Sequence, residues 1–257
     1  MQIIDGIKRY FNESGFKKAV IGLSGGIDSS LATLLVSDAI SKENISPIFM
    51  PSEFTLEESR KNVYNFCKNL GIVSTEIDIT GIVDKYLETL CDKYLIKEIG
   101  IPEENLQARI RGNILMWLAN RDHALVIATG NRSEILTGYC TLYGDTVGAV
   151  APIGALYKIE VYEISRWINK ERNNIIPLSI LKQEPSAELS IGQKDEKDLY
   201  PYKILDSILK LYVDEEKSIE EIVDEGYDKE VVKDIIRMIN LNKFKLKQLP
   251  PVIILKK

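Results

Sequence analysis

The sequence predicts an α/β protein, a three-layer, doubly wound parallel sheet of about five strands with a helical C-terminal extension. Two observations predict this class. Short runs of apolar and β-branched residues alternate with longer stretches of helical periodicity over the first two-thirds of the chain. From Pro177 onward the sequence turns polar and helical. Strands that alternate with helices need crossover connections, which are right-handed and make the strands parallel.

Four segments have the composition of buried strands, because each is a short apolar run that ends at a turn. They cover residues 18–23, 45–50, 72–79 and 124–129. Helical periodicity predicts helices over residues 27–40, 55–70, 82–97 and 103–121. Thr55 is expected to cap the second helix, where Glu57 and Glu58 favour the positive end of the helix dipole.

The extension, residues 177–257, is predicted to contain three further helices. They cover residues 195–214, 219–226 and 229–240. Neither an internal repeat nor a low-complexity linker divides the chain. One domain over residues 1–257, with the extension as part of it, is therefore the simplest expectation.

The composition excludes several classes of function. His123 is the one histidine, and its neighbours at a predicted helix-to-strand junction indicate a structural or surface role, which argues against a Ser-His-Asp triad and a histidine-based metal site. The three cysteines form no CxxC pair, which argues against a disulfide framework and a zinc site. A net charge of −5 without a long basic run disfavours nucleic acid as a partner. Without a membrane-spanning apolar run or a signal peptide, a cytoplasmic protein without a membrane partner is expected.

The segment Ser24-Gly25-Gly26-Ile27-Asp28-Ser29-Ser30 stands between the first predicted strand and the first predicted helix. Paired glycines let the backbone approach a ligand, and free N–H groups at a helix start favour an anion. The segment is neither a Walker A loop nor the Gly-x-Gly-x-x-Gly dinucleotide motif. A carboxylate at Asp28 beside a bound polyphosphate requires a cation between them, for which Mg²⁺ is suited. The alternative is that Asp28 only complements the helix dipole.

This segment resembles the pyrophosphate-binding loop of the N-type ATP pyrophosphatases, which cleave ATP to AMP and pyrophosphate. The resemblance implies an adenine-nucleotide α-hydrolase-like fold, with ATP as co-substrate and Mg²⁺ as cofactor. It also implies that ATP is bound by the loop residues Gly22, Leu23, Ser24, Gly25, Gly26, Ile27, Asp28 and Ser29. Later segments extend the resemblance from about Lys18 to Pro250 and narrow it to the NAD synthetases.

Two later segments resemble parts of the family that hold the metal and the nucleotide. Residues 129–134, Thr-Gly-Asn-Arg-Ser-Glu, imply that Thr129 contacts ATP and that Glu134 ligates magnesium. Asp28 and Glu134 would then reach one cation from adjacent strand ends. Residues 152–158 open a helix and place Lys158 at the family's ATP-contacting lysine, where its charge would offset that of the leaving pyrophosphate.

The segment from Asn105 to Arg111 is similar to the helix with which NAD synthetases hold their substrate. Arg109 matches the family's substrate-contacting arginine. Residues two apart on a helix diverge by about 200°, so Arg111 is expected to make a structural ion pair instead. The alternative for either arginine is a solvated charge on the helix surface.

The segment from Leu136 to Asp145 resembles the family's loop around Tyr-Gly-Asp. This implies that Tyr139 packs on the nicotinate ring of the substrate. Asp145 would lie near the reacting centre, where it is a candidate to accept a proton from ammonium. Leu142 and Ala149 stand where the family pattern has a lysine and an aspartate, so those two substrate contacts cannot be carried over.

The last segments of the resemblance lie in the extension. Ser186 falls where the family has a Thr or Ser that contacts ATP. Residues 245–250 resemble the family's C-terminal His-Lys-Arg segment without its histidine. Lys245 and Lys247 remain candidates for contact with the phosphates of the substrate.

Taken together, the resemblance implies ATP-dependent amidation of deamido-NAD by ammonia, through a carboxyl-adenylate that releases AMP and pyrophosphate. Free ammonia is the expected nitrogen donor, because 257 residues leave no room for a glutaminase domain. A separate glutaminase partner is the alternative source, and the family is generally homodimeric. Other readings are a GMP synthetase-like enzyme, a tRNA thiolase or a non-catalytic adenine-nucleotide sensor. The apolar residues 115–118 beside Arg109 are expected to serve either a subunit interface or the core.

Overall fold

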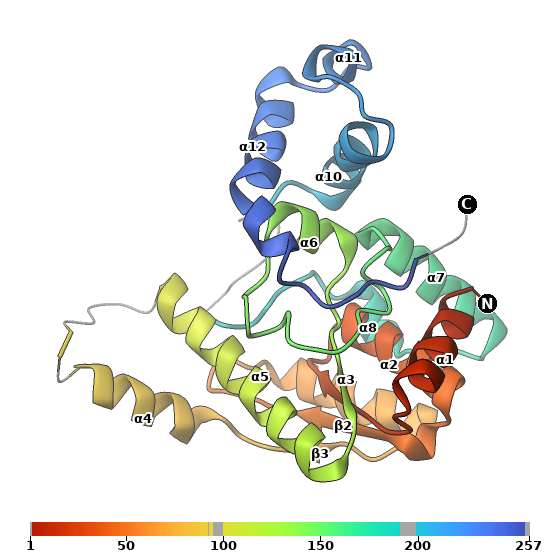
Figure 1. The fold of residues 1–257 in the computed structure, drawn as a ribbon, viewed down its shortest axis with the longest axis vertical. Coiled ribbons are helices and arrows are strands. Elements are labelled where there is room, and N and C mark those ends of the chain that lie inside the picture. Colours follow the sequence, from red (N-terminus) through yellow and green to blue (C-terminus); the bar gives the residue numbers. More distant parts are fainter. Residues whose placement is uncertain (1, 92, 95–99, 191–198, 255–257) are drawn as a thin grey trace.

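One parallel sheet of four strands organises the computed structural model, which describes residues 2–91, 93–94, 100–190 and 199–254 (Figure 1). The strand order is β3-β2-β1-β4. The strands are β1 Ala19–Leu23, β2 Ile45–Phe49, β3 Thr75–Glu76 and β4 Leu125–Ile127. The predicted parallel α/β class is confirmed, and the described residues form four strands where about five were expected. Isolated parallel bridges continue the sheet beyond β4, from Ile127 to Val150 and from Ala151 to Val252.

β1 is a central strand, paired in register with β2 on one side and β4 on the other. Ala19 lies opposite both Ile45 and Leu125. Because β1 and β4 are neighbours, the loops that follow them lie at the same edge of the sheet. The prediction that Asp28 and Glu134 follow adjacent strand ends is confirmed by this pairing.

β3 is much shorter than the predicted strand over residues 72–79. Both of its residues are exposed at the edge of the sheet. Beyond it, Ile77 N donates to Phe49 O at 2.8 Å and Ile79 N donates to Pro51 O at 2.9 Å. The segment therefore runs beside β2 but forms only two residues of regular ladder.

The two faces of the sheet bury different side chains, as expected for parallel strands that are covered on both sides. Ile21 and Leu23 belong to a core shared with helices on one face, whereas Val20 and Ile48 belong to a core on the other. The helices of the first core are α1 Gln2–Ser14, α2 Ile27–Ile40, α3 Glu57–Leu70, α7 Lys158–Glu171 and α8 Leu178–Lys182. Those of the second are α4 Thr80–Cys91 and α5 Ile101–Asp122. Leu115 and Leu118 are buried in this second core, while Met116 and Trp117 are exposed.

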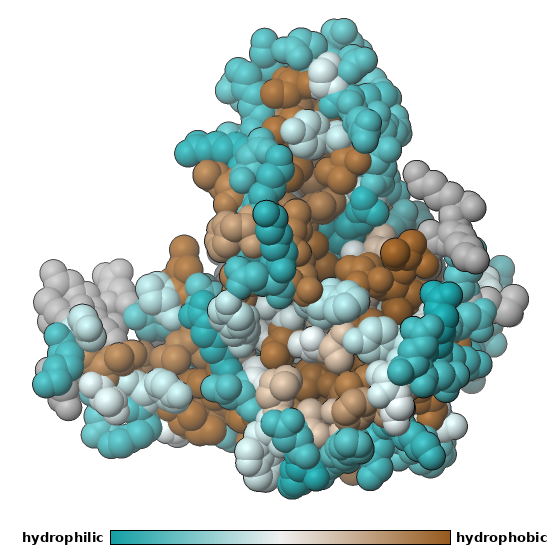
Figure 2. Space-filling model, in the orientation of Figure 1, coloured by the Kyte–Doolittle hydropathy of each residue, from teal (hydrophilic) through white to brown (hydrophobic). Residues whose placement is uncertain are grey.

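The helical extension forms a third core of its own, in which Leu205, Ile208, Val232 and Ile235 are buried. Its elements are α10 Tyr202–Leu209, the π-helical turn η2 Lys210–Asp214, α11 Ile219–Asp224 and α12 Lys229–Leu246. Figure 2 shows apolar side chains gathered between α10 and α12, with hydrophilic ones on the outer surface. The remaining short helices are η1 Lys42–Asn44 and α6 Arg132–Thr137. Figure 1 shows the extension standing on α6 and α7.

The predicted helices of the extension are present with shifted bounds. The helix predicted over residues 195–214 begins at Tyr202, and residues 195–198 lie outside the described residues. α12 continues to Leu246, past the predicted end at Asn240.

The start of α3 differs from the prediction that Thr55 caps it. The residue at the N-cap is Leu56, whose side chain cannot accept a hydrogen bond. Thr55 Oγ1 instead accepts a hydrogen bond from Ser52 N at 3.0 Å. Glu188 binds the N-cap residue from a distant loop, because its Oε2 accepts from Leu56 N at 3.1 Å. Part of what holds the start of α3 is therefore a tertiary contact, which local sequence patterns cannot reveal.

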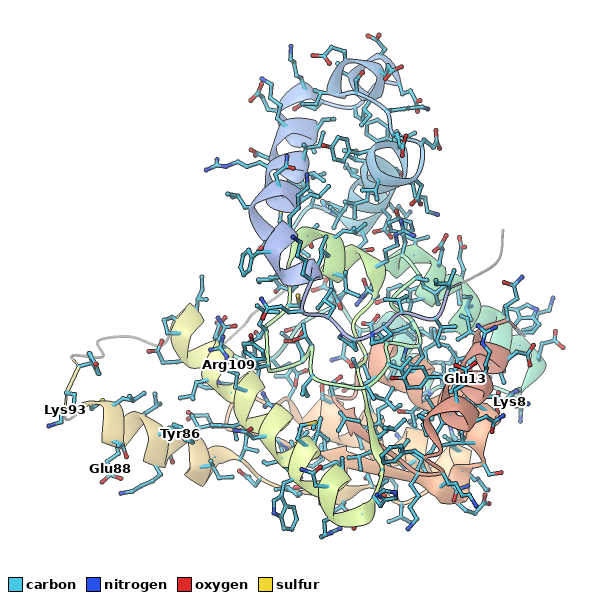
Figure 3. The ribbon with its side chains drawn as sticks, viewed as in Figure 1. Lys8, Glu13, Tyr86, Glu88, Lys93 and Arg109 are labelled. Carbon is cyan, nitrogen blue, oxygen red and sulfur yellow. The ribbon has the colours of Figure 1, made fainter. Side chains whose placement is uncertain are left out.

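α4 lies at one side of the molecule and buries little of its surface. Val83 is its one buried residue, and Figure 3 shows Tyr86 and Glu88 along this helix. Across the part of the chain that the structure describes, none of the helices combines the length and apolarity that crossing a membrane requires.

Gly25 allows the loop after β1 to pass against α3. Its φ is +88°, and a Cβ atom at this position would lie 2.6 Å from Ser59 O. We expect Gly25→Ala to lower the free energy of unfolding by about 2–3 kcal/mol, because it combines backbone strain with a clash against backbone. Gly15→Ala is the matched control, since its φ is +75° with nothing within 4 Å, and should cost only about 1 kcal/mol. Urea unfolding measures both changes, and an equal loss of unfolding free energy in the two variants would contradict the close contact at Gly25.

Candidate active site

A cavity of about 940 Å³ opens beyond the carboxyl ends of β1 and β4. This is where ligands bind in open parallel sheets, at the point where the order of the strands reverses. The loop after β1, the N-terminal half of α5, the loop after β4 and the segment 183–190 all contribute to its wall. Of the predicted site residues, the ones that line it are Gly22, Leu23, Ser24, Gly26, Ile27, Asp28, Ser29, Thr129, Glu134, Tyr139, Asp145, Lys158, Ser186 and Lys245. Gly25, Arg109 and Lys247 do not.

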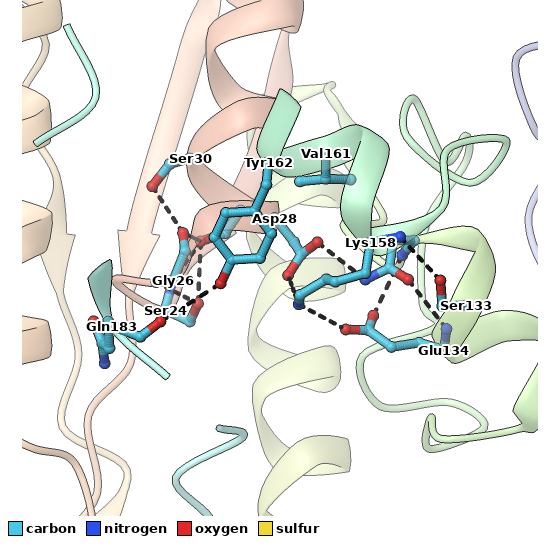
Figure 4. A network of polar contacts seen from close by, with 12 residues as sticks. Ser24, Gly26, Asp28, Ser30, Ser133, Glu134, Lys158, Val161, Tyr162 and Gln183 are labelled. Atoms are coloured by element: carbon cyan, nitrogen blue, oxygen red, sulfur yellow. Dashed lines mark hydrogen bonds and ion pairs between the residues drawn. The ribbon is translucent and has the colours of Figure 1, made fainter. Parts of the chain in front are cut away.

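The loop after β1 is closed on itself by its own hydroxyl groups. Gly26 N donates to Ser24 Oγ at 3.2 Å, and the Ser24 and Ser29 hydroxyls lie 3.1 Å apart. Ser30 Oγ donates to Gly26 O at 2.8 Å, so this hydroxyl is used within the loop (Figure 4). Gly26 is the N-cap of α2 and offers no side-chain cap, which leaves the first turn of this helix open to an anion.

A buried lysine joins the two predicted metal ligands. Lys158 Nζ lies 2.5 Å from Asp28 Oδ2 and 3.3 Å from Glu134 Oε1. The lysine residue is 2% exposed, whereas both carboxylate side chains are 18% exposed. Asn131 Nδ2 donates to the other oxygen of Asp28 at 3.0 Å. Figure 4 shows these side chains converging between α2, α6 and α7; Asp28, Lys158 and Glu134 are called the acid–lysine cluster below.

Each member of the acid–lysine cluster stands in the first turn of a helix. Asp28 is the second residue of α2, Glu134 the third of α6, and Lys158 the first of α7. Glu134 is further held by a capping box with Asn131, in which Glu134 N donates to Asn131 Oδ1 at 3.1 Å. The Asn-x-x-Glu spacing of this box is visible in the sequence and is the signal that could have assigned a role to Asn131.

The donors of the acid–lysine cluster fit a magnesium ion that arrives with a nucleotide. Asp28 and Glu134 present oxygen ligands to one point, at which the Lys158 ammonium now sits. The described residues contain no group of three or more acidic, histidine or cysteine side chains that could hold a metal by themselves. Mg²⁺ in nucleotide sites keeps several waters and takes one or two carboxylates together with the phosphates. Asp28 and Glu134 are the residues that would hold it.

The two arginines of α5 diverge, as helix geometry requires. Arg111, which was expected to make a structural ion pair, is the one that lines the cavity, and Arg109, which was expected to contact substrate, does not line it. Arg109 is exposed and its Nε donates to Leu142 O at 3.2 Å (Figure 3). Arg111 lines the cavity and its Nε donates to Met50 O at 2.9 Å. No carboxylate lies within ion-pair distance of Arg111 in the described ranges, so its expected ion pair is replaced by hydrogen bonds. Burial lowers the pKa of Arg111 to about 10, and the charge of Glu188 offsets part of this.

Asp145 lines the cavity from the loop between α6 and the bridge residue Val150. Thr141 N donates to Asp145 Oδ1 at 2.6 Å, which fixes the carboxylate. Surrounding protein withdraws it from bulk water and raises its pKa to about 6, although the side chain is exposed toward the cavity. Cys140 lies beside it, and burial raises the pKa of its thiol to about 12, which disfavours the thiolate form. Lys245 Nζ donates to Gly138 O at 2.7 Å and to Cys140 O at 2.8 Å.

The segment 183–190 forms one wall of the cavity and is held by Glu188. Besides accepting from Leu56 N, Glu188 accepts a hydrogen bond from Ser59 Oγ at 2.5 Å. Ser186 Oγ accepts from Glu188 N at 3.2 Å, which orients the predicted ATP-contacting hydroxyl. Ser59 and Gln183 line the cavity as well, and no sequence motif points to either residue.

The sequence of this chain matches the family model described as NAD synthase over residues 1–249. The chain belongs to the NAD synthase family. A glutamine-dependent NAD(+) synthetase from Thermotoga maritima is 48% identical to it over 247 residues, which are 96% of this chain and 43% of that protein. The chain thus spans less than half the length of the curated relatives it matches.

Two solved structures of NAD synthetases resemble this fold. The NH3-dependent NAD synthetase from Campylobacter jejuni, in complex with nitrate, has a TM-score of 0.78 at 27% identity, covering 99% of this chain and 96% of that one. The glutamine-dependent NAD+ synthetase from Acinetobacter baumannii, in complex with ADP, has a TM-score of 0.69 at 34% identity. That match covers 96% of this chain and 44% of the longer one.

Leu142 and Ala149, which depart from the family's residue pattern, serve this NAD synthase fold through backbone atoms. Leu142 O accepts from Arg109, and Ala149 O accepts from Tyr10 Oη at 2.6 Å. Neither residue lines the cavity. The lysine and aspartate contacts of the family pattern therefore have no counterpart at these two positions.

Replacing Lys158 with Met should leave two carboxylates facing each other without their cation. We expect the free energy of unfolding to fall by about 2 kcal/mol, since one partner of a largely buried ion pair is removed. Millimolar Mg²⁺ should then raise the melting temperature of this variant more than that of the unchanged protein, because the ion can replace the ammonium. Lys210→Met, which removes the surface ion pair with Glu160, is the control and should show no such Mg²⁺ effect. An equal effect of Mg²⁺ on the melting temperatures of both variants would contradict the assignment of Asp28 and Glu134 as Mg²⁺ ligands.

Replacing Asp145 with Asn should change the pH dependence of stability, since Asn keeps the acceptor for Thr141 N but cannot ionise. The native protein holds a proton on Asp145 between about pH 4 and pH 6, where the unfolded chain has lost it. The free energy of unfolding of the unchanged protein should therefore fall, relative to that of the variant, as pH rises through this range. The exposure of the Asp145 side chain limits the size of the effect. Urea unfolding of both proteins over this range measures it, and a pH-independent difference would contradict the raised pKa.

Proposed function

We propose that this chain catalyses the ATP-dependent amidation of deamido-NAD by ammonia, through a carboxyl-adenylate, with release of AMP and pyrophosphate. The observation that carries the proposal is the acid–lysine cluster, which lines the cavity beside an open helix N-terminus. Membership of the NAD synthase family supports it. The cavity volume lies at the upper end of the range of about 300–1,000 Å³ for ligand sites, which suits two large substrates.

The adenylation step uses charge placed where charge develops. A carboxylate oxygen of the substrate bonds to the α-phosphorus of ATP, and the bond from that phosphorus to the pyrophosphate oxygen breaks. The amides and hydroxyls of residues 24–29 bind the departing pyrophosphate, while Thr129 and Ser186 contact ATP. Lys158 adds a cation on the side of the leaving group. Mg²⁺, held by Asp28 and Glu134, would neutralise phosphate charge and orient the nucleotide.

The amidation step needs ammonia in its neutral form. The ammonia nitrogen bonds to the carbonyl carbon, the bond from that carbon to the AMP oxygen breaks, and a proton leaves the nitrogen. Asp145 is the proposed acceptor of a proton from ammonium, because its raised pKa makes it a better base than an ordinary carboxylate. Tyr139 packs on the nicotinate ring and Lys245 contacts phosphate in this proposal.

Two substrate contacts drawn from the family resemblance have weaker support. Arg109 lies outside the cavity and Lys247 is exposed, so each would meet substrate only at the edge of the site. Arg111, which lines the cavity beside Glu188, is the alternative arginine for the substrate.

We also propose a cytoplasmic homodimer with the exposed apolar side chains of α4 and α5 at its interface. Tyr86, Leu90, Met116 and Trp117 are each at least 39% exposed. The match to part of glutamine-dependent relatives also supports a glutaminase, carried elsewhere, as a second source of ammonia. Sedimentation of the purified chain would test the dimer.

Pyrophosphate release tests the proposed reaction. We expect sustained release over many turnovers only when ATP, Mg²⁺, deamido-NAD and ammonium are all present, with NAD and AMP formed in equal amounts. Glutamine should not replace ammonium unless a glutaminase is added. Release that depends on xanthosine monophosphate or tRNA instead would favour another adenylating enzyme, and nucleotide binding without turnover would favour a sensor.

Substitution of the carboxylates tests their assignment. Asp28→Asn and Glu134→Gln should each lower kcat by about 100-fold to 1,000-fold, because each removes a charge from the leaving-group site. Asp38→Asn is the matched control. Asp38 lies on the same helix α2 but outside the cluster, and it forms an ion pair with Arg172. An unchanged kcat in either carboxylate variant would contradict the assignment.

A further inference from the structure

Asp206 is a buried carboxylate that none of the proposed chemical steps uses. It lies on α10 in the helical extension and is 2% exposed. Its Oδ1 accepts a hydrogen bond from Ser133 Oγ at 2.5 Å, and its Oδ2 accepts one from Ile159 N at 2.8 Å. Both donors belong to first turns of helices on which the extension stands, α6 and α7.

The partners of Asp206 are the immediate neighbours of the acid–lysine cluster. Ser133 precedes Glu134, and Ile159 follows Lys158. Ser133 Oγ also accepts a hydrogen bond from Lys158 N at 2.9 Å. One carboxylate therefore ties the backbone beside the metal ligand to the backbone beside the lysine.

The geometry of this link depends on the negative charge of Asp206. The Ser133 hydroxyl has one proton, which it gives to Asp206, so that its lone pair remains free for Lys158 N. The carboxylate also lies at the positive ends of two helix dipoles, which favours its charged form. Burial opposes this charge and raises the pKa of Asp206, while the bonds from Ser133 and Ile159 lower it.

We propose that Asp206 is a positioning residue that fixes the distance between Lys158 and Glu134, and through it the site for Mg²⁺ and the leaving pyrophosphate. This inference rests on the proposed function of the acid–lysine cluster. It makes the helical extension part of the active site, although α10 itself contributes no side chain to the wall of the cavity.

A second carboxylate of the extension provides a matched comparison. Asp214 in η2 forms an ion pair with Arg132 and accepts from Tyr157 Oη at 3.0 Å. It therefore joins the same extension to the first turn of α6 and the N-cap of α7. Its partners are side-chain atoms of Arg132 and Tyr157 and not the backbone beside the cluster, so loss of Asp214 should weaken docking without displacing the cluster.

The experiment compares Asp206→Asn with Asp214→Asn in the full chain. Calorimetric titration of ATP into the protein at a series of Mg²⁺ concentrations gives the Mg²⁺ concentration for half-maximal binding. We expect Asp206→Asn to raise this concentration about tenfold, the effect typical of losing a residue that orients a metal ligand. Its kcat should fall while its KM for deamido-NAD stays unchanged. Asp214→Asn should lower the melting temperature but keep the Mg²⁺ dependence of the unchanged protein.

Ser133→Ala provides an independent test, because it breaks the same link from the other side. The double variant with Asp206→Asn should show no further change in Mg²⁺ dependence beyond either single variant. If Asp206→Asn does not fold, a tenfold change in Ser133→Ala supports the proposal and an unchanged Mg²⁺ dependence overturns it. For a folded Asp206→Asn protein, the same Mg²⁺ dependence as the unchanged protein overturns it.

Failure of the proposal and failure of the proposed function give different results. ATP binding is measured without deamido-NAD, so it reports on Asp206 whatever the acceptor acid is. Altered Mg²⁺ dependence without turnover of deamido-NAD would leave the positioning role and remove the proposed reaction. Normal turnover of deamido-NAD, together with an unaltered Mg²⁺ dependence in Asp206→Asn, would support the proposed reaction and remove the positioning role of Asp206.

Discussion

The contact of one ammonium with two carboxylates is the interaction on which the rest of the site depends. Lys158 is buried, and a buried cation is stable only when it is paired and hydrogen-bonded. Its pairing requires α2, α6 and α7 to begin at the same place. For α2 and α6 this follows from the neighbouring positions of β1 and β4, and α7 comes after the segment whose Val150 forms a parallel bridge with Ile127 of β4. The order of the strands and the chemistry of the site are therefore two aspects of one arrangement.

Much of this arrangement could be predicted from the sequence. The apolar runs predicted β1, β2 and β4, and the Ser-Gly segment predicted a loop between a strand and a helix that lines the cavity, because these signals are local. β3 was predicted too long, since edge strands carry polar residues whose pairing depends on neighbours. Thr55 was the wrong cap for α3, because Leu56 is the N-cap residue and Thr55 Oγ1 accepts from Ser52 N instead.

The contacts of the charged residues could not be predicted in the same way. Helix geometry separated Arg109 from Arg111, but only the packing of α5 shows that Arg111 faces the cavity. In α10, apolar residues such as Leu205 and Ile208 form the face that packs in the core. A charged residue such as Asp206 is therefore expected from sequence alone to lie on the solvated face. Its burial depends on α6 and α7, whose backbone donors no pattern of side chains encodes.

The distance along the chain between the partners of the cluster has a consequence for how the protein matures. Asp28 and Lys158 are separated by 130 residues, so closing that contact requires a long and entropically costly loop. A nascent chain that has emerged only through α5 holds Asp28 but neither Glu134 nor Lys158. The acid–lysine cluster can therefore form only after the first turn of α7 has left the ribosome.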